Sequence, residues 1–319
     1  NFYTLTIYEK GAEIARMLHT FLGADGFRRG SDHYFKTYDG QAAIVEDFLN
    51  SMAVANGLDA GAFVSQWLRW YRQPGTPVVS VNSVWQKDIQ RLTLTLTQTQ
   101  SSKSSSTPES LPIPVRLGFI GKEGELSTSL NGVTANEHLL VLEQAEQSWQ
   151  FDDVSQVPVL SLFRDFSAPV RVKAEFGDAD LAQLIRLDSN SFNRWSASYA
   201  LATREILALA EQYRSGDLRA HQPQESALAA AIAEVWSELA ASDPALAAKM
   251  LQLPSLAYLS DQVACYDPEA LQRARESVLL QVIAPLQSAL GAVLAKQEML
   301  KPYVYSAQAI AARSVEAVA

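Results

Sequence analysis

Hydrophobic residues in the first 74 positions follow the spacing of amphipathic helices. In the first helix, apolar side chains recur three, four, seven and eight positions apart, as on one buried face, and a glycine follows as a natural stop: Ile14, Met17, Leu18, Phe21, Leu22, then Gly23. A shorter helix is expected through Phe27 and Tyr34, a third over residues 44–52, and a fourth with Asp59 as its N-cap. The segment 74–77 contains two prolines and ends this region, because proline has no amide donor. The pattern predicts a helical domain over residues 1–74.

From residue 75 the hydrophobic period changes to two. Leu92, Leu94 and Leu96 alternate with threonines, as expected for a half-buried strand. Other strand candidates are the runs 78–84, 113–120, 139–142, 149–151, 157–163 and 170–176. About seven short strands with turn residues between them predict an antiparallel β-sandwich over residues 75–176. The serine-rich run 101–106 is expected to form a mobile hairpin loop inside this domain.

Residues 177–319 again have helical spacing and are rich in alanine and leucine. Helix starts are predicted near Asp178 or Asp180, Ser191, Glu225, Asp243, Ser255 and Asp267. Successive helices joined by short polar turns predict an α-solenoid, although no clean sequence repeat is visible. The expected fold class is therefore α+β multidomain: a helical region, an antiparallel β-sandwich and a superhelical α-solenoid segment.

Composition and charge narrow the classes of partner. The chain has 35 acidic and 26 basic residues, a net charge of −9, which argues against a general nucleic-acid binder. The single cysteine, Cys265, excludes an internal disulfide and fits a reducing compartment, so a cytoplasmic location is expected. No apolar run approaches the roughly 20 residues of a membrane span, and no membrane association is expected. Because the chain starts without Met and ends without a helix stop signal, we expect it to be a piece of a longer protein.

The side chains, considered without any family resemblance, do not indicate a particular reaction. His19, His33, His138 and His221 form no His-Glu-x-x-His motif and do not pair with Cys265 at metal-ligand spacing, so a structural role is expected for each. The sequence has no phosphate-binding glycine loop, no Gly-x-Ser-x-Gly elbow and no dinucleotide fingerprint.

Two tyrosines, Tyr3 and Tyr8, precede the first helix and allow two interpretations. In one, they are boundary aromatics with a packed ring and a hydrated hydroxyl. In the other, a tyrosine at the helix start points its hydroxyl into a cleft. There it could donate a hydrogen bond to a developing oxyanion, since a tyrosine hydroxyl keeps its proton near pH 7.

The segment from Tyr3 to Glu13 resembles the stretch just after the zinc motif of aminopeptidase N, the bacterial alanyl aminopeptidase of the gluzincin class. The likeness continues in order across about 250 residues, at 39–40, 69–71, 75–78, 166–170, 192–195 and 243–248. It implies the end of a thermolysin-like catalytic domain over residues 1–74, a β-sandwich over 75–176, and the start of a helical superhelix over 177–319.

The resemblance also implies a reaction, the removal of N-terminal amino acids from peptide substrates. In that family a zinc ion is held by two histidines of His-Glu-x-x-His and a later Glu, and the Glu of the motif is the general base. These elements, and the Gly-x-Met-x-Asn stretch that helps to bind the free amino terminus, do not occur here. The resemblance assigns to Tyr8 the hydroxyl that stabilises the tetrahedral intermediate, and to Tyr3 a wall of the pocket for the substrate's first side chain.

The missing elements lead to three further expectations. The chain alone should bind no zinc and hydrolyse no aminoacyl amide, because an oxyanion donor assists only a positioned substrate and nucleophile. Residues 1–74 should either self-associate through an apolar face that the rest of a catalytic domain would cover, or be less ordered than the sandwich. The alternative is a non-catalytic scaffold or interaction module built from the β-sandwich and the helical solenoid.

Overall fold

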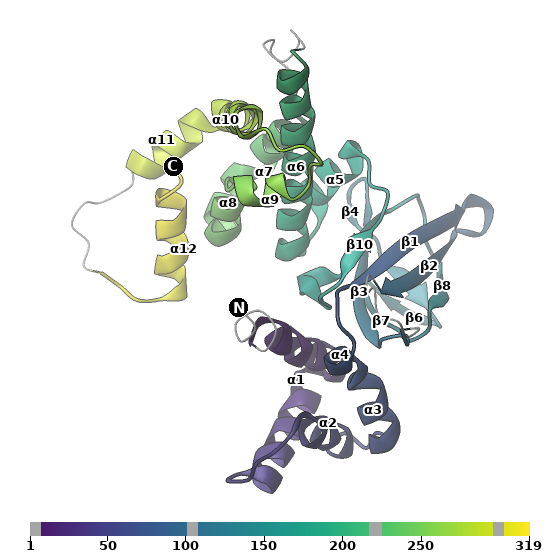
Figure 1. The fold of residues 1–319 in the computed structure, drawn as a ribbon. Coiled ribbons are helices and arrows are strands. Elements are labelled where there is room, and N and C mark those ends of the chain that lie inside the picture. The colour runs from purple at the N-terminus through teal and green to yellow at the C-terminus, as the bar shows by residue number, and fades with distance from the viewer. Residues whose placement is uncertain (1–7, 101–107, 217–224, 296–302) are drawn as a thin grey trace. The chain divides into compact units, whose positions relative to one another are not determined.

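The computed structural model of the protein describes residues 8–100, 108–216, 225–295 and 303–319 (Figure 1). Tyr3, the serine-rich run 101–106 and His221 therefore lie outside the described residues. The chain forms two compact units, residues 1–121 with 125–175, and residues 122–124 with 176–319. The three predicted domains stay a prediction, since the first two of them belong to one unit here.

The first unit begins with four helices, α1 (Lys10–Tyr38), α2 (Val45–Val54), α3 (Ala60–Trp67) and α4 (Arg69–Arg72). Gly23 has a φ of +71°, which interrupts the helical backbone of α1, and the helix resumes directly afterwards. The glycine predicted to end the first helix is thus a kink between two helical segments. Asp59 caps α3 as predicted, since its carboxylate accepts a hydrogen bond from the amide of Ala62 at 2.8 Å.

Small residues let α1 and α2 approach closely. A Cβ atom at Gly30 would lie only 2.3 Å from Sδ of Met52, so a larger residue there would push the helices apart. Met52 and Leu49 are fully buried at this contact. The shared core of the four helices continues through Trp67 and Trp70, which are each 1% exposed.

The β-sandwich consists of two sheets. One has the strand order β10-β1-β2-β8-β5-β6, and the other has the order β4-β3-β7, with β9 also paired to β3. The described strands are β1 (Pro77–Gln86), β2 (Arg91–Gln100), β3 (Ile113–Gly121), β4 (Gly124–Glu125), β5 (Thr128–Leu130), β6 (Val133–Ala135), β7 (Glu137–Leu142), β8 (Glu146–Asp152), β9 (Val159–Leu162) and β10 (Arg171–Lys173).

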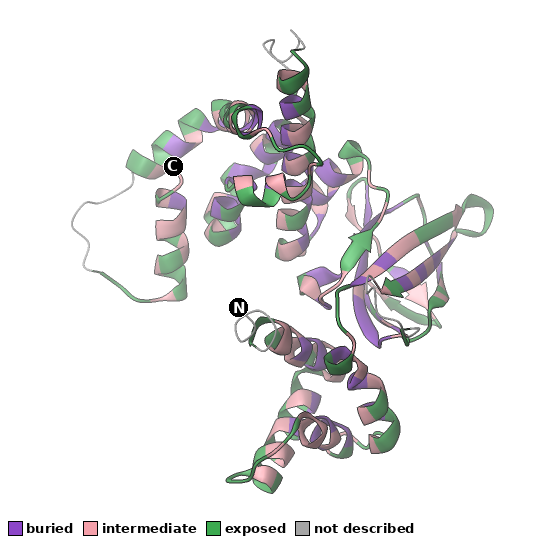
Figure 2. Ribbon diagram, in the orientation of Figure 1, coloured by how far each residue is buried: buried purple, intermediate pink, exposed green. Residues whose placement is uncertain are grey.

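The period of two in β2 produces one buried and one partly exposed face. Leu92, Leu94 and Leu96 are at most 2% exposed, while Thr95 on the other face lies 2.8 Å from the Ser148 hydroxyl on β8. β3 is buried along nearly its whole length, as the purple ribbon in Figure 2 shows. Residues 113–120, predicted as a strand, thus form a central part of the sandwich core.

One strand pairing differs from the predicted antiparallel sandwich. β10 pairs with β1 in parallel, with Val79 opposite Val172, whereas the other described pairings are antiparallel. The prediction also missed the short strands β4, β5 and β6, which are two or three residues long. Strands this short carry too few positions to show an alternating pattern.

The helices and the sandwich of the first unit are joined by side chains that donate to backbone carbonyls. The indole of Trp70 donates to the carbonyl of Pro112 at 2.9 Å, and Arg69 donates to the carbonyl of Ser110 at 2.7 Å. The chain before β3 thus satisfies its backbone acceptors with side chains of α4.

The second unit is a stack of helices with side-chain caps at most starts. Its helices are α5 (Asp178–Leu187), α6 (Ser191–Ser215), α7 (Ala227–Ser242), α8 (Pro244–Met250), α9 (Leu256–Ser260), α10 (Pro268–Ile283), α11 (Gln287–Ala295) and α12 (Ala307–Glu316). The starts predicted at Asp243, Ser255 and Asp267 are confirmed, because each of these side chains accepts a hydrogen bond from the amide three residues on.

One stretch of the second unit is more hydrophobic than expected from the prediction that no apolar run approaches the length of a membrane span. Pro268–Ala295 is, by length and composition alone, long and apolar enough to cross a membrane, with a mean hydropathy of 1.9 in its most apolar window. Gln281 and Gln287 divide this stretch, so a search for uninterrupted apolar residues does not find it. A 3₁₀ turn at Ala284–Leu286 separates α10 from α11, and Val278 and Val282 of α10 are buried.

Candidate functional site

Tyr8 lies on a π-helical turn formed by residues 8 and 9, directly before α1. The residue is 66% exposed, and its hydroxyl makes no hydrogen bond to any described residue. Single π turns recur at functional sites, because they redirect a side chain without ending the helix. Burial of the neighbouring Lys10 lowers the pKa of its ammonium. The arrangement presents a phenol hydroxyl that is open to a ligand.

The helix after Tyr8 is fixed by its buried face. Ile14, Met17 and Leu18 are at most 1% exposed, which matches the buried face predicted from their spacing. One turn later the ring of Phe21 packs against Trp67 of α3, with 5.3 Å between centroids. Tyr8 is therefore carried on a segment that is held by packing from its second turn onward. Tyr3 lies outside the described residues, and its predicted pocket role stays a prediction.

The described residues offer no donor set for zinc. Within residues 8–100, 108–216, 225–295 and 303–319, no three His, Cys, Asp or Glu side chains are close enough together to hold a metal ion. His138 is engaged with Thr128 inside the sandwich, and His19 is an exposed side chain whose ring lies edge-on to Phe27. Zinc therefore does not fit the residues seen here, and no chemical step through zinc is assigned to them.

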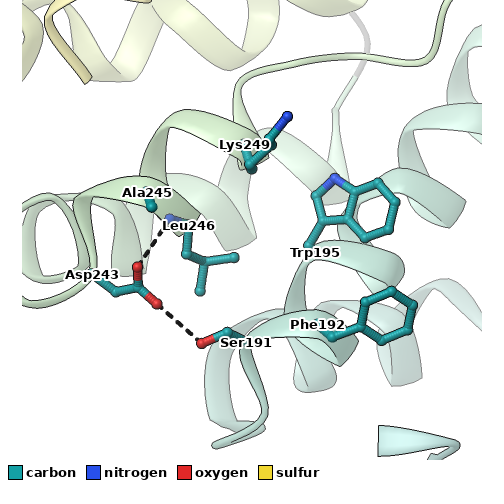
Figure 3. Close-up of a pocket in the computed structure, with 7 residues that line it drawn as sticks. All are labelled: Ser191, Phe192, Trp195, Asp243, Ala245, Leu246 and Lys249. Carbon is teal, nitrogen blue, oxygen red and sulfur yellow. Dashed lines mark hydrogen bonds between the residues drawn. The ribbon is translucent and has the colours of Figure 1, made fainter. Parts of the chain in front are cut away.

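A pocket of about 470 Å³ lies between α6 and α8 in the second unit. Figure 3 shows the aromatic rings of Phe192 and Trp195 along α6, with Lys249 and Leu246 opposite them on α8. Sequence reasoning did not find this pocket. In the sequence, the segments 192–195 and 243–248 show only a family likeness, and nothing in their spacing shows that they meet.

The polar groups of this pocket have partners within the protein. The Asp243 carboxylate accepts from the Leu246 amide at 3.1 Å and from the Ser191 hydroxyl at 3.0 Å (Figure 3). Lys249 lies 3.1 Å from the side-chain oxygen of Gln252. What remains for a ligand is mainly the apolar wall formed by Phe192 and Trp195. The seven lining residues therefore form a mainly apolar binding surface beside the hydrogen-bonded pair of Ser191 and Asp243.

Three family models match consecutive parts of the chain. Residues 1–67 match the peptidase family M1 domain. Residues 75–175 match a domain of unknown function (DUF3458) with an Ig-like fold, and residues 178–319 match its C-terminal partner domain, which is described as ARM repeats. The Ig-like and ARM-repeat descriptions agree with the predicted and observed order of helices, β-sandwich and helical solenoid.

Relatives align with nearly the whole length of the chain. It is 35% identical to aminopeptidase N of Escherichia coli over 297 residues, which are 92% of this chain and 33% of the relative. It is 37% identical to aminopeptidase N of Caulobacter vibrioides over 90% of this chain and 31% of the relative. The crystal structure of Legionella pneumophila aminopeptidase A in complex with aspartic acid superposes with a TM-score of 0.79 at 25% identity. That match covers 99% of this chain and 35% of the Legionella chain.

The matched models are, in chain order, a peptidase family M1 domain, an Ig-like domain and ARM repeats. Over about 90% of its length, the chain is similar to the aminopeptidase N proteins. It spans about one third of the length of the relatives that it matches.

Proposed function

We propose that this chain is part of a zinc metalloaminopeptidase that removes N-terminal amino acids from peptides. The observation that carries the proposal is the identity of 35% with aminopeptidase N over 92% of the chain, including the match of residues 1–67 to a peptidase domain. The zinc ion of that enzyme would be held by residues that this sequence does not contain. The exposed free thiol of Cys265 suits a reducing compartment, so we also propose a cytoplasmic location.

In this proposal Tyr8 donates a hydrogen bond to the oxyanion of the tetrahedral intermediate. Its 66% exposure directly before α1 supports this role. A donor of this kind typically lowers the barrier by ~3–4 kcal/mol, and it acts only where the attacking group and the substrate are already positioned. Tyr3, five residues earlier, is proposed to form a wall of the pocket for the substrate's first side chain.

The test compares three proteins with a chromogenic alanyl substrate: the longer enzyme, its Tyr8→Phe variant and the 319-residue chain alone. We expect the longer enzyme to turn over substrate and to lose activity with a zinc chelator. Tyr8→Phe should lower kcat by about 10²- to 10³-fold, because the hydroxyl acts mainly in the transition state. The chain alone should show no turnover and no stoichiometric zinc, with or without added zinc.

The control variant is Tyr266→Phe, which removes a hydroxyl from an equally accessible tyrosine that is 55% exposed in the second unit. It should leave kcat unchanged. Sustained turnover by the chain alone would contradict the proposal that the zinc ion is held by residues outside this sequence. A Tyr8→Phe enzyme with normal kcat would contradict the role of Tyr8.

A second candidate function is an interaction module, favoured by the apolar pocket beside Phe192 and Trp195. Helical solenoids often bind partners on such surfaces. The same assay separates the two functions. A longer protein without turnover or zinc would favour the module, and so would a reading frame that truly starts at Asn1. A frame that encodes His-Glu-x-x-His upstream of Asn1 would favour the enzyme.

A further inference from the structure

The turn after β9 in the sandwich has an unusual backbone. Phe163, Asp165 and Phe166 all have φ between +52° and +54°, a region that side-chain-bearing residues seldom adopt. Residues held in this region persist only where their surroundings fix them. We call residues 163–167 the turn. Its unfavourable backbone conformation must be stabilised by contacts with the rest of the sandwich.

Arg164 anchors this turn from inside the sandwich. Its side chain is only 3% exposed, and it donates to the Ser161 hydroxyl at 2.8 Å and to the Glu125 carboxylate at 2.6 Å. The guanidinium lies directly on Gly118 of β3, where an added Cβ would be 2.1 Å from Cζ. A buried arginine with paired charges is costly to displace, so the turn is rigid on this side.

A second set of contacts fixes the outer side of the turn. Arg116 of β3 forms an ion pair with the carboxylate of Asp165, and the Arg116 amide donates to the Ser167 hydroxyl at 3.1 Å. That hydroxyl in turn donates to the carbonyl of Pro114 at 3.0 Å. With both sides fixed, the carbonyl groups of residues 165 and 166 project from the sandwich as a preformed pair of acceptors.

Arg16 of α1 occupies these two acceptors. Its Nη1 donates to the carbonyl of Asp165 and its Nη2 to the carbonyl of Phe166, in the two-pronged geometry that suits a guanidinium. Glu13 accepts from Nε at 3.0 Å, and the guanidinium carbon lies 5.3 Å from the centroid of the Phe166 ring. One side chain thus ties the first half of α1 to a turn 149 residues away.

We infer that Arg16 is a positioning residue for Tyr8, an inference that rests on the proposed function. Residue 16 follows residue 8 by two turns of helix, about 12 Å along the axis. The break at Gly23 comes after both residues, so the helical segment between them moves as one body. An oxyanion donor displaced by about 1 Å can lose on the order of 100-fold in rate, so a fixed helix start matters for Tyr8.

The test places Arg16→Met in the longer enzyme, because methionine keeps the length of the side chain but donates no hydrogen bond. We expect kcat to fall about ten- to hundred-fold while KM changes less than about twofold, since an oxyanion donor acts in the transition state. Arg16→Lys should recover part of the loss through a single donor. The matched control is Arg28→Met, which removes an exposed arginine of the same helix that pairs with Asp32 at 2.9 Å. It should leave kcat unchanged.

A double-mutant cycle shows whether Arg16 acts through Tyr8. In the Tyr8→Phe enzyme, Arg16→Met should cost less than about twofold in kcat, because the group that it positions is already gone. An equal fold loss in both backgrounds would overturn the inference and would leave Arg16 a general structural contact. A normal kcat for Arg16→Met in the wild-type background would overturn it as well.

Hydrogen exchange in the 319-residue chain supplies a readout that needs no activity. Arg16→Met should speed exchange of the amides of residues 10–18 at least about tenfold, while Arg28→Met should not. If the longer enzyme is inactive, the proposed function fails, and this measurement still decides whether the contact holds the start of α1. Unchanged exchange in Arg16→Met would overturn the inference whatever the activity.

Discussion

His138 is enclosed by aromatic side chains inside the β-sandwich. Its Nε2 lies 3.0 Å from the Thr128 hydroxyl and 3.1 Å from the Thr128 carbonyl, and its ring contacts Phe119 and Phe151. The residue is 6% exposed, and this burial lowers the pKa of the imidazole. The structural role predicted for this histidine is confirmed, because its neighbours are packing and hydrogen-bonding groups of the sandwich.

The lowered pKa of His138 makes stability depend on pH in a defined direction. The unfolded imidazole has a pKa of about 6.5, so just below that pH the unfolded chain binds a proton that the folded chain excludes. The stability from neutral His138 is fully present above the unfolded pKa and is lost as pH falls through the folded pKa. We expect His138→Gln to weaken the loss of stability between pH 7 and pH 5 in urea unfolding experiments.

The control for this change is His19→Gln, which replaces an exposed histidine on α1. It should leave the acid dependence of the wild-type chain intact. One proton can contribute at most about 1.4 kcal/mol per pH unit, which sets the scale of the difference to be measured. The assignment to His138 is wrong if both variants lose stability with acid in parallel with the wild type.

At the scale of helices, the carboxylate of Asp243 forms hydrogen bonds at the starts of two helices, α8 and α6. It caps α8 through the Leu246 amide and also accepts from Ser191, the first residue of α6. Asp267 makes the equivalent cap at α10 through Ala270 at 3.0 Å. Comparing the two caps separates the local contribution of an N-cap from the contribution of the contact between helices.

We expect Asp243→Ala to lower the free energy of unfolding of the second unit by about 2 kcal/mol, and Asp267→Ala by about 1 kcal/mol. An N-cap is typically worth about 1 kcal/mol, and a further side-chain hydrogen bond adds about another. Asp243→Asn, which can still cap, should lose less than Asp243→Ala. Chemical denaturation followed by circular dichroism measures these differences. Equal losses at both sites would mean that the Ser191 contact adds nothing to stability.

At the scale of the whole molecule, the first helices expose large apolar side chains. Phe35 is 66% exposed, Ile44 is 59% exposed and Val54 is 49% exposed, all within residues 1–74. We propose that this region covers itself by self-association in the isolated chain, since exposed apolar surface favours contact with other surfaces.

Sedimentation velocity over a range of concentrations tests this proposal. The isolated chain should form concentration-dependent oligomers, and a Phe35→Ser/Ile44→Ser double variant should shift the distribution towards monomer. Leu280→Ser is the control, since it removes an apolar side chain that is 68% exposed in the second unit. A monomeric wild-type chain would contradict the proposal, and so would association that responds to Leu280→Ser alone.

Local patterns in the sequence predict those parts of the fold that depend on interactions between residues close together along the chain. The alternation around Leu94 predicts β2, and side chains such as Asp59 and Asp267 mark helix starts, because the forces involved act within a few residues. The parallel pairing of β10 and the clamp between Arg16 and the turn at 163–167 depend on residues that meet only after folding. No spacing rule reports such contacts.

The same distinction between local patterns and long-range contacts applies to the candidate site. The position of Tyr8 before a recognisable helix is visible in the sequence, but its proposed role rests on resemblance and not on spacing. The sequence does not predict the pocket between Phe192 and Leu246, because its two walls come from different helices about fifty residues apart. What fixes Tyr8 in place is likewise remote in sequence, since Arg16 reaches across to the backbone of the sandwich.

The parallel pairing of β10 with β1 has a mechanical consequence. β1 is the first strand of the sandwich and β10 is the last, so the chain enters and leaves the domain through two adjacent strands that run in the same direction. Tension between the two ends of the domain would pull these strands lengthwise past each other. Their hydrogen bonds, along the pairs from Val78 with Arg171 to Ser80 with Lys173, would then share the load in shear and would not peel open one after another. Stretching the sandwich from its two ends would therefore have to break these hydrogen bonds together.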